Sequence, residues 1–156
     1  MTNVNRGKQF EKQVQSALEK IDGIYVQRLY DTMNGFKNIA NPCDYLVYAY
    51  PNLCLLECKS CHGASFSKTN ITDYQYEMLL KADKIKGIVA GYMIWFIDRD
   101  VTVFVTADIL DKYLDYTNRK SLSYTDAINI GFEIKGRKRS ILFDYDMKEF
   151  IDYVNR

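Results

Sequence analysis

The amino-acid sequence predicts an α/β fold in which a mixed β-sheet is flanked by helices. Three observations support this prediction. The chain opens with an amphipathic helical pattern, three strand-like segments follow, and a second helix separates these from two further strands, after which the pattern is mostly helical. A mixed sheet covered by helices is the architecture that this order implies.

The composition is typical of a soluble globular protein. The 156 residues are 47% hydrophobic and 26% charged, and no linker or repeat divides them, so we expect a single domain over residues 1–156. The longest apolar run, 88–97, is about half the ~20 residues that a membrane-spanning helix needs. Residues 1–6 lack the apolar core of a secretory signal. We therefore expect a cytoplasmic protein with no membrane partner.

The first helix is predicted from apolar residues at helical spacing, which are Phe10, Val14, Ala17, Leu18 and Ile21. Gly23 is expected to end this helix, and a short strand over 24–29 follows it. Residues 30–41 contain Asn34-Gly35 and little periodicity, so we expect a connecting loop there.

Segments 44–49 and 54–59 are expected to form an antiparallel hairpin. Proline cannot adopt the positive φ of a tight two-residue turn, so we place Pro51-Asn52 at the centre of a type I turn within a four-residue loop. Counting outward from this loop gives the following opposite pairs: Ala49 and Cys54, Leu46 and Glu57, and Asp44 and Lys59.

Asp44, Glu57 and Lys59 therefore share one face of the sheet, about 5–8 Å apart at Cβ. Two carboxylates at this spacing can share a hard divalent cation that polarises a phosphate and activates a water, while the ammonium orients that water or balances charge. This arrangement suits hydrolysis of a phosphodiester. The alternative is an ion-pair ladder on the hairpin surface, but Glu57 and Lys59 follow the apolar run 53–56, where unpaired charges are costly.

A second helix is predicted after Thr72, because Thr72-x-x-Gln75 has the form of a capping box. Its apolar stripe consists of Met78, Leu79, Ala82 and Ile85, and ends before Gly87. Segments 88–97 and 101–105 are expected to form another hairpin, with helical stretches near 108–115 and 147–154.

Pro42-Cys43-Asp44 followed by Glu57-Cys58-Lys59 resembles the motif of the PD-(D/E)XK nuclease superfamily, with one residue inserted between the proline and the aspartate. Further residues along nearly the whole chain resemble the RecU family of Holliday junction resolvases: Asn5-Arg6-Gly7, Phe10-Glu11, Asp44-Tyr45, Phe66-Ser67, Asn70-Ile71, Gln75, Gly87-Ile88, Val103-Phe104 and Ile130-Gly131-Phe132. The resemblance implies a restriction-endonuclease-like fold in a single nuclease domain. It also implies a homodimeric endodeoxyribonuclease of DNA recombination and repair that nicks two opposed strands of a four-way junction.

The same resemblance implies roles for individual residues. Asp44 and Glu57 bind Mg²⁺, for which Mn²⁺ can substitute, and Lys59 assists the attacking water. Glu11 joins the metal-binding cluster, and Gln75 lies near the catalytic site. Two alternatives remain open, with Glu11 as an ordinary solvated helix residue and Gln75 as the acceptor of a capping box.

One segment departs from the family pattern. Family members resemble one another in a long protrusion that precedes the catalytic aspartate and projects towards the junction centre. The corresponding segment of this chain, residues 30–41, is short. Phe36 and Lys37 are expected to form a reduced version of it. Such compact forms resemble phage-type resolvases.

The formal net charge is only +1, so any DNA-binding surface must be local. The clearest cluster is Lys-Gly-Arg-Lys-Arg at 135–139, a basic turn that suits a solvated hairpin loop and phosphate contacts equally well. The residues predicted to bind DNA are Arg6, Lys8, Phe36, Lys37, Arg137, Lys138 and Arg139. Two other functions remain open: a sequence-specific restriction-type or other nuclease of the superfamily, and a non-catalytic DNA-binding module, against which the intact acidic pair argues.

The cysteines, which are Cys43, Cys54, Cys58 and Cys61, are expected to be free thiols. Cys58-x-x-Cys61-His62 matches the attachment pattern of c-type haem, and the same residues with Cys54 contain a possible zinc set. Cys54 and Cys58 alternate with Leu56 in a predicted strand, which favours packing as small apolar side chains.

Overall fold

The computed structural model describes residues 5–30 and 40–156. In these ranges the helices are α1 (Arg6–Glu19), η1 (Lys68–Asn70), α2 (Asp73–Asp83), η2 (Ile97–Arg99), α3 (Ala107–Thr117), α4 (Tyr124–Ile130) and α5 (Lys148–Val154), where η denotes a 3₁₀ helix. The strands are β1 (Tyr25–Arg28), β2 (Tyr45–Ala49), β3 (Asn52–Cys61), β4 (Ser65–Ser67), β5 (Ile88–Phe96), β6 (Val101–Thr106), β7 (Ser121–Ser123), β8 (Phe132–Glu133), β9 (Gly136–Arg139) and β10 (Leu142–Tyr145).

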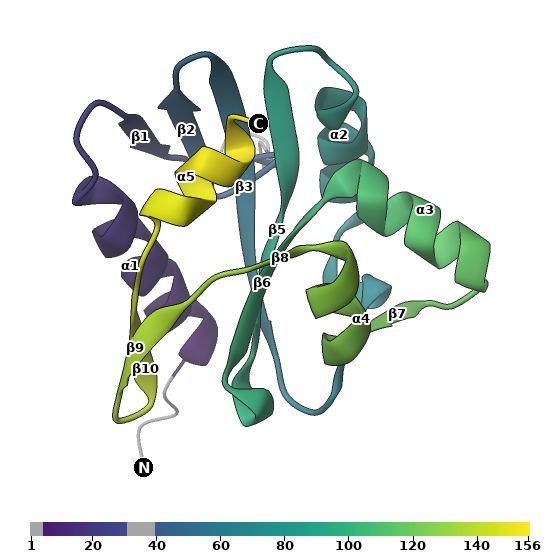
Figure 1. Cartoon of the computed structure of the whole chain (residues 1–156). Helices are drawn as coiled ribbons and strands as arrows, with labels where there is room; N and C mark the ends of the chain where they lie inside the picture. Colours follow the sequence, from purple (N-terminus) through teal and green to yellow (C-terminus); the bar gives the residue numbers. More distant parts are fainter. Residues whose placement is uncertain (1–4, 31–39) are drawn as a thin grey trace, which may run out of the picture.

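A six-stranded sheet of order β1-β2-β3-β5-β6-β8 forms the centre of the molecule (Figure 1). β3 and β5 run parallel, and the other neighbouring strands run antiparallel. Two small antiparallel pairs, β4 with β7 and β9 with β10, lie outside this sheet. The predicted mixed sheet with flanking helices is thereby confirmed.

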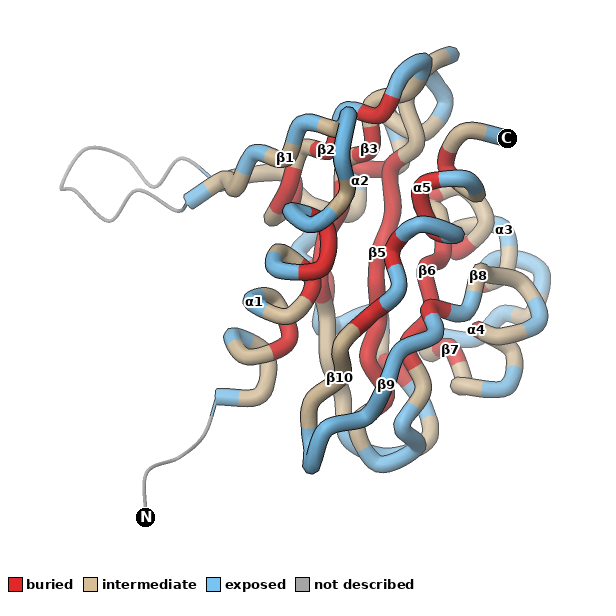
Figure 2. Tube along the Cα trace, turned by 60° about the vertical axis from the view of Figure 1, so that its left-hand side comes forward, coloured by how far each residue is buried: buried red, intermediate tan, exposed pale blue. Residues whose placement is uncertain are grey.

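The two faces of the central sheet carry separate hydrophobic clusters. On one face, α1, α5 and the β9–β10 hairpin pack against side chains that include Val47, Cys54 and Cys58. On the other face, α2, α3 and α4 pack against side chains that include Leu55 and Tyr92. Figure 2 shows that the buried residues follow the central strands. The predicted packing of Cys54 and Cys58 as apolar residues is confirmed.

The first helix forms as predicted. Its buried side chains are Phe10, Val14, Ala17 and Leu18, and Asn5 caps its first turn by accepting from the backbone N–H of Lys8. Ile21 lies beyond the helix, and Gly23 has a φ of 80°, a left-handed conformation that suits glycine in the turn into β1. In the described ranges, no helix is both long and apolar enough to cross a membrane.

The turn of the β2–β3 hairpin differs from the prediction. Ala49 pairs with Asn52, so the connection is two residues long, and its Tyr50–Pro51 peptide bond is cis. The register is shifted by two residues from the predicted one. Since side chains alternate between the faces of a sheet with a period of two, this shift leaves each side chain on its predicted face.

The last third of the chain contains more strand than predicted. The basic segment 135–139 is not a turn, because β9 pairs with β10 and the chain reverses at Ser140, which has a φ of 59°. Gly136 serves this pairing, since a Cβ there would lie 2.7 Å from the carbonyl oxygen of Asp144. The glycine thus allows close backbone approach, which the sequence pattern alone does not distinguish from a turn.

The apolar stripe of the second helix is only partly as predicted. Leu79 is buried and Ala82 is half-buried, whereas Met78 and Ile85 are exposed. The inward side of α2 instead carries Asp83, whose carboxylate accepts hydrogen bonds from backbone N–H groups of β5 and α3. The helix is therefore rotated relative to the predicted stripe.

Candidate active site

The residues of the predicted nuclease motif meet where β1, β2 and β3 lie side by side. Asp44 immediately precedes β2, and its backbone N–H donates to the carbonyl of Leu56 in β3 at 3.1 Å. Its own carbonyl accepts from the N–H of Leu29, just after β1, at 2.8 Å. The Asp44 carboxylate also accepts from the backbone N–H of Cys58 at 2.8 Å. The sheet itself therefore holds Asp44 beside Glu57.

Glu57 lies at the centre of a closed set of contacts that we call the Glu57 cluster, consisting of Glu57, Lys59 and Gln75. Lys59 Nζ lies 3.0 Å from Glu57 Oε1, and Gln75 Nε2 donates to the same oxygen at 2.9 Å. Lys59 Nζ also donates to Gln75 Oε1 at 3.2 Å. The second carboxylate oxygen, Glu57 Oε2, is buried and accepts no hydrogen bond from any described residue.

The electrostatics of the two carboxylates reflect their burial. Glu57 is only 3% exposed, and burial together with the charge of Asp44 raises its pKa to about 7, against the lowering effect of Lys59 and Gln75. Burial also raises the pKa of Asp44, although the hydrogen bond from Cys58 lowers it. Without a cation, two ionised carboxylates at this position are costly.

Gln75 reaches the cluster because of the way α2 begins. Thr72 caps the helix, and its hydroxyl accepts from the backbone N–H of Gln75 at 3.2 Å. The side chain of Gln75 then points to Glu57 and Lys59 rather than back to the cap. Gln75 therefore takes part in the cap only through its backbone N–H, which donates to Thr72. Its side chain contacts the motif residues and does not act as the acceptor of a capping box.

Glu11 reaches this region through an arginine. Glu11 Oε2 accepts from Arg28 Nη2 at 2.7 Å, and the same nitrogen lies 3.8 Å from Asp44 Oδ1. Arg28 Nη1 also donates to the hydroxyl of Tyr45 at 2.6 Å, and that hydroxyl donates to the backbone carbonyl of Glu11 at 3.0 Å. Glu11 is therefore not an ordinary solvated residue, because Arg28 links it to Asp44.

Arg28 was missed by the sequence reasoning. It lies in β1 on the same face as Val26, so an arginine at an inward-facing strand position was the available signal. Burial is the largest single effect on its guanidinium and lowers the pKa. The hydrogen bond to Glu11 and the charges of Tyr45, Glu11 and Asp44 together outweigh it, so the pKa is raised and the group keeps its charge.

The donor set fits a hard divalent cation at Asp44 and Glu57. Both are oxygen ligands, their raised pKa values reflect unfavourable negative charge, and Glu57 Oε2 lacks a partner. Among the described residues, no three His, Cys, Asp or Glu side chains gather in a form that could hold a metal ion. The structure thus brings two of the three predicted metal ligands together and engages Glu11 with Arg28.

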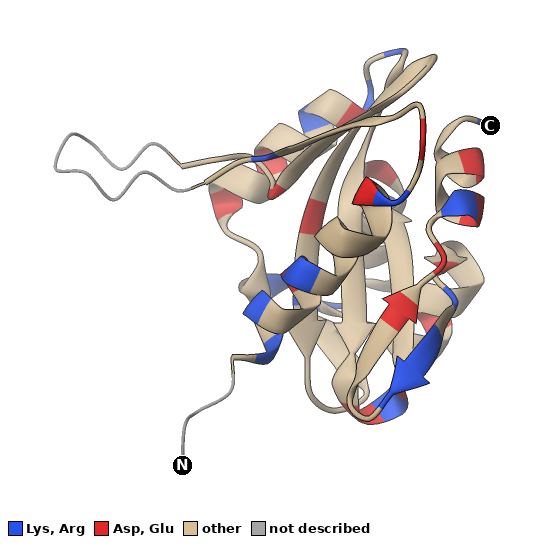
Figure 3. Ribbon diagram, turned by 90° about the vertical axis from the view of Figure 1, so that its left-hand side faces the viewer, with Lys and Arg blue, Asp and Glu red and all other residues tan. Residues whose placement is uncertain are grey.

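The predicted DNA-binding residues fall in two described regions, as the basic residues on α1 and along β9 show in Figure 3. On α1, Lys8 is exposed, and Arg6 donates to Gln9 at 2.9 Å. On β9, Lys138 lies 2.6 Å from Asp100, and Arg139 pairs with Asp144 across the hairpin. The remaining residues Phe36 and Lys37 lie outside the described residues.

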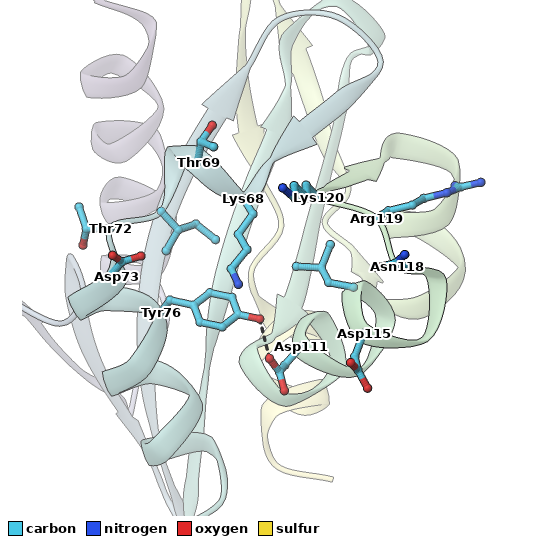
Figure 4. A pocket seen from close by; sticks show the side chains of 12 residues that line it. Lys68, Thr69, Thr72, Asp73, Tyr76, Asp111, Asp115, Asn118, Arg119 and Lys120 are labelled. Carbon is cyan, nitrogen blue, oxygen red and sulfur yellow. Dashed lines mark hydrogen bonds between the residues drawn. The ribbon is translucent and has the colours of Figure 1, made fainter.

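A cavity of about 650 Å³ lies on another side of α2 (Figure 4). Tyr76 spans it, donating to Asp111 of α3 at 2.7 Å, and Lys68 Nζ lies 4.1 Å from the centre of the Tyr76 ring. Thr72 lines the cavity, but the Glu57 cluster does not. This cavity is therefore separate from the motif residues.

The fold is similar to that of Hjc, a Holliday junction resolvase from the archaeal hyperthermophile Archaeoglobus fulgidus, with a TM-score of 0.57. The two chains are 17% identical, and the match covers 81% of this chain and 95% of Hjc. No curated protein sequence matches the chain. The family model of recombination protein U, RecU, matches residues 20–152, a range that includes Arg28, Asp44 and the Glu57 cluster. The chain therefore belongs to the RecU family.

Proposed function

We propose that this protein is a Holliday junction resolvase, an endodeoxyribonuclease that hydrolyses phosphodiester bonds of four-way DNA junctions with Mg²⁺. The observation that carries the proposal is the buried Glu57 cluster beside Asp44, in a chain of the RecU family. Hjc, which shares the fold, is a Holliday junction resolvase.

Asp44 and Glu57 hold the metal ion in this proposal, Glu57 through its unpartnered Oε2. When bound, Mg²⁺ supplies Lewis-acid polarisation of the phosphate and lowers the pKa of a water, and Mn²⁺ can replace it. Asp44 is held in place by the N–H of Cys58, so its carboxylate needs little reorganisation to bind the ion.

Lys59 orients the attacking water in this proposal. The Lys59 ammonium has three N–H donors. Two of them face Glu57 Oε1 and Gln75 Oε1, which leaves the third for the water or for the charge that develops on the phosphate. Gln75 holds both partners at once, because its amide donates to Glu57 and accepts from Lys59. Arg28 and Glu11 act as positioning residues for Asp44.

In this proposal the protein acts as a homodimer, because a four-way junction presents two equivalent strands and a two-fold dimer matches this symmetry. Its DNA contacts come from Arg6 and Lys8, from Phe36 and Lys37, and from the basic residues of β9.

The test is cleavage of a labelled four-way junction, compared with duplex and single-stranded DNA of the same sequence. We expect paired nicks in the junction with Mg²⁺ or Mn²⁺ and none with EDTA. Cleavage of the duplex at a fixed sequence with equal efficiency would support a restriction-type nuclease instead. Junction binding without cleavage under any metal condition would support a non-catalytic module.

A further inference from the structure

The cavity between α2 and α3 has no part in the proposed hydrolysis. Its volume of about 650 Å³ falls within the roughly 300–1,000 Å³ that small-molecule sites of proteins occupy. Its lining comes from η1, the first half of α2, the second half of α3 and the connection from α3 to β7 (Figure 4). Several separate segments of the chain thus surround one space that is large enough for a small molecule.

The floor of this cavity is apolar. Ile71 and Leu114 are buried and line it beside the half-buried ring of Tyr76. The hydrogen bond from the Tyr76 hydroxyl to Asp111 fixes the orientation of that ring. A floor of this kind suits a ligand with a flat apolar face, such as an aromatic ring system.

One side of the cavity is basic. Because β4 and β7 pair antiparallel, the backbone N–H of Lys68 donates to the carbonyl of Lys120 at 2.9 Å, and both residues line the cavity. In the described ranges neither ammonium takes part in an ion pair, and Lys68 Nζ lies over the Tyr76 ring instead. Two neighbouring lysines without a carboxylate partner suit a phosphate group.

The other side of the cavity offers a hydrogen-bond acceptor. Asp111 uses Oδ1 to accept from Tyr76, and no described residue donates to its Oδ2. In the view of Figure 4, Lys120 and Asp111 lie on opposite sides of the cavity, with Lys68 between them. None of the ion pairs among the described residues joins either lysine to Asp111. The cavity therefore suits a ligand that is anionic at one end and carries N–H donors at the other.

We propose that this cavity binds a nucleotide whose phosphate lies at Lys68 and Lys120. The base lies on the floor at Leu114 and Tyr76, and N–H groups of its edge donate to Asp111. A nucleotide combines a phosphate, a flat base and N–H donors in this order. The choice of a nucleotide rests on the proposed function, since a DNA nuclease meets nucleotides both free and within strands.

The acceptor also predicts which base is preferred. Guanine presents two adjacent donors, N1–H and the N2 amino group, to a carboxylate. The single N3–H of thymine is flanked by the O2 and O4 acceptors, which a carboxylate repels. We therefore expect guanine to bind more tightly than thymine at Asp111.

The nucleotide site adjoins the turn that positions Gln75. Thr72 lines the cavity, and its hydroxyl accepts from the backbone N–H of Gln75 at 3.2 Å. Tyr76, the next residue, forms part of the floor. A bound nucleotide should therefore slow hydrogen exchange of the amides in the first turns of α2.

The first test is a titration of the wild-type protein in EDTA, followed by two-dimensional NMR of its backbone amides. Adding dGMP should shift the amides of Thr72, Tyr76 and Leu114, and dGMP should bind about tenfold more tightly than dTMP. Deoxyguanosine and inorganic phosphate should each bind more weakly than dGMP. Shifts confined to the surroundings of Asp44 and Glu57 would overturn the inference, as would no shift at millimolar dGMP or equal binding of phosphate alone.

The second test uses variants. Lys120→Ala should weaken dGMP binding about fivefold, whereas the control Lys81→Ala, an exposed lysine of α2 outside the cavity, should not. Asp111→Asn can still accept from Tyr76 but loses the charge, so it should reduce the preference for dGMP over dTMP, and Asp152→Asn on α5 is its control. If Asp111→Asn does not fold, which circular dichroism would reveal, Lys120→Ala still decides the matter, and unchanged binding there would contradict the proposal.

A pentanucleotide with one guanine among thymines distinguishes the two sources of the nucleotide. If it shifts the same amides and competes with dGMP, the cavity holds a nucleotide within a DNA strand, and if only dGMP binds, the cavity holds a free nucleotide. Failure of the proposed function is separate from failure of this site. A protein that binds dGMP in the cavity but cleaves no junction keeps the site and loses the nuclease, whereas a junction nuclease that binds neither probe there loses only the site.

Discussion

Two charged regions of this molecule differ in how their charges are balanced. In the Glu57 cluster, a carboxylate that is 3% exposed keeps one oxygen without a partner. On β9, the basic side chains are exposed, and two of the three neutralise acidic groups of the same chain, Asp100 and Asp144. A buried carboxylate with an oxygen that accepts no hydrogen bond is costly and is retained where it has a task, whereas a dense run of exposed charge can simply be solvated. Burial, rather than charge density, therefore marks the site.

The largest effect should come from removing the charge of Glu57. Glu57→Gln keeps the shape and the hydrogen bonds of the side chain but removes a proposed metal ligand, so junction cleavage should fall on the order of 10³-fold while binding persists. Asp44→Asn should behave alike. The measurement is single-turnover cleavage with saturating Mg²⁺, together with a binding assay in Ca²⁺. Asp115→Asn, an exposed carboxylate on α3, is the control, and full activity of Glu57→Gln would remove Glu57 from the site.

The next effect concerns stability and pH without metal. The pKa of Glu57 is raised from an ordinary 4.5 to about 7, so the folded state binds more protons than the unfolded state between these values. The free energy of unfolding should therefore fall as the pH rises through this window, by about 2 kcal/mol more in the wild type than in Glu57→Gln. Chemical denaturation at about pH 5 and about pH 8 measures this. Added Mg²⁺ should flatten the dependence, and identical profiles for both proteins would contradict the buried-charge account.

A smaller effect is expected at Arg28. Arg28→Met removes the partner of Glu11 and a cation near Asp44, so it should destabilise the fold by about 1 kcal/mol and lower cleavage several-fold. Adding Glu11→Gln to the Arg28→Met variant should recover part of the lost stability, since the Glu11 carboxylate that Arg28→Met leaves unpaired is then replaced by a neutral amide. Additive losses in this double-mutant cycle would show that the two side chains act independently.

The smallest effect should come from β9. Replacing Arg137, Lys138 and Arg139 by alanine should weaken binding to junction and duplex alike, by about threefold, because phosphate contacts carry no shape information. Since Lys138 and Arg139 are engaged by carboxylates, the slope of log affinity against log salt should fall by about 1 rather than by about 3. A fall near 3 in salt titrations would show that all three side chains contact phosphates.

Much of the fold could be predicted from the sequence, because helices and strands follow the periodic spacing of apolar residues. The buried stripe of α1 and the β5–β6 hairpin match their patterns, and Glu57 and Lys59 lie on the predicted face even though the register is shifted by two residues. Features that depend on tertiary contacts were not accessible. The rotation of α2, the pairing of β9 and the link from Arg28 to Glu11 are each set by residues distant in the sequence.

Cys58 contributes both to the hydrophobic core and to the candidate active site. Its thiol fills the core on the α1 side, while its backbone N–H holds the carboxylate of Asp44. A larger side chain at this position would push the strand outward and carry that N–H with it. Packing beneath the sheet is therefore mechanically coupled to the placement of the Asp44 carboxylate, the proposed metal ligand, and core volume at Cys58 should tune the site without any change in its chemical groups.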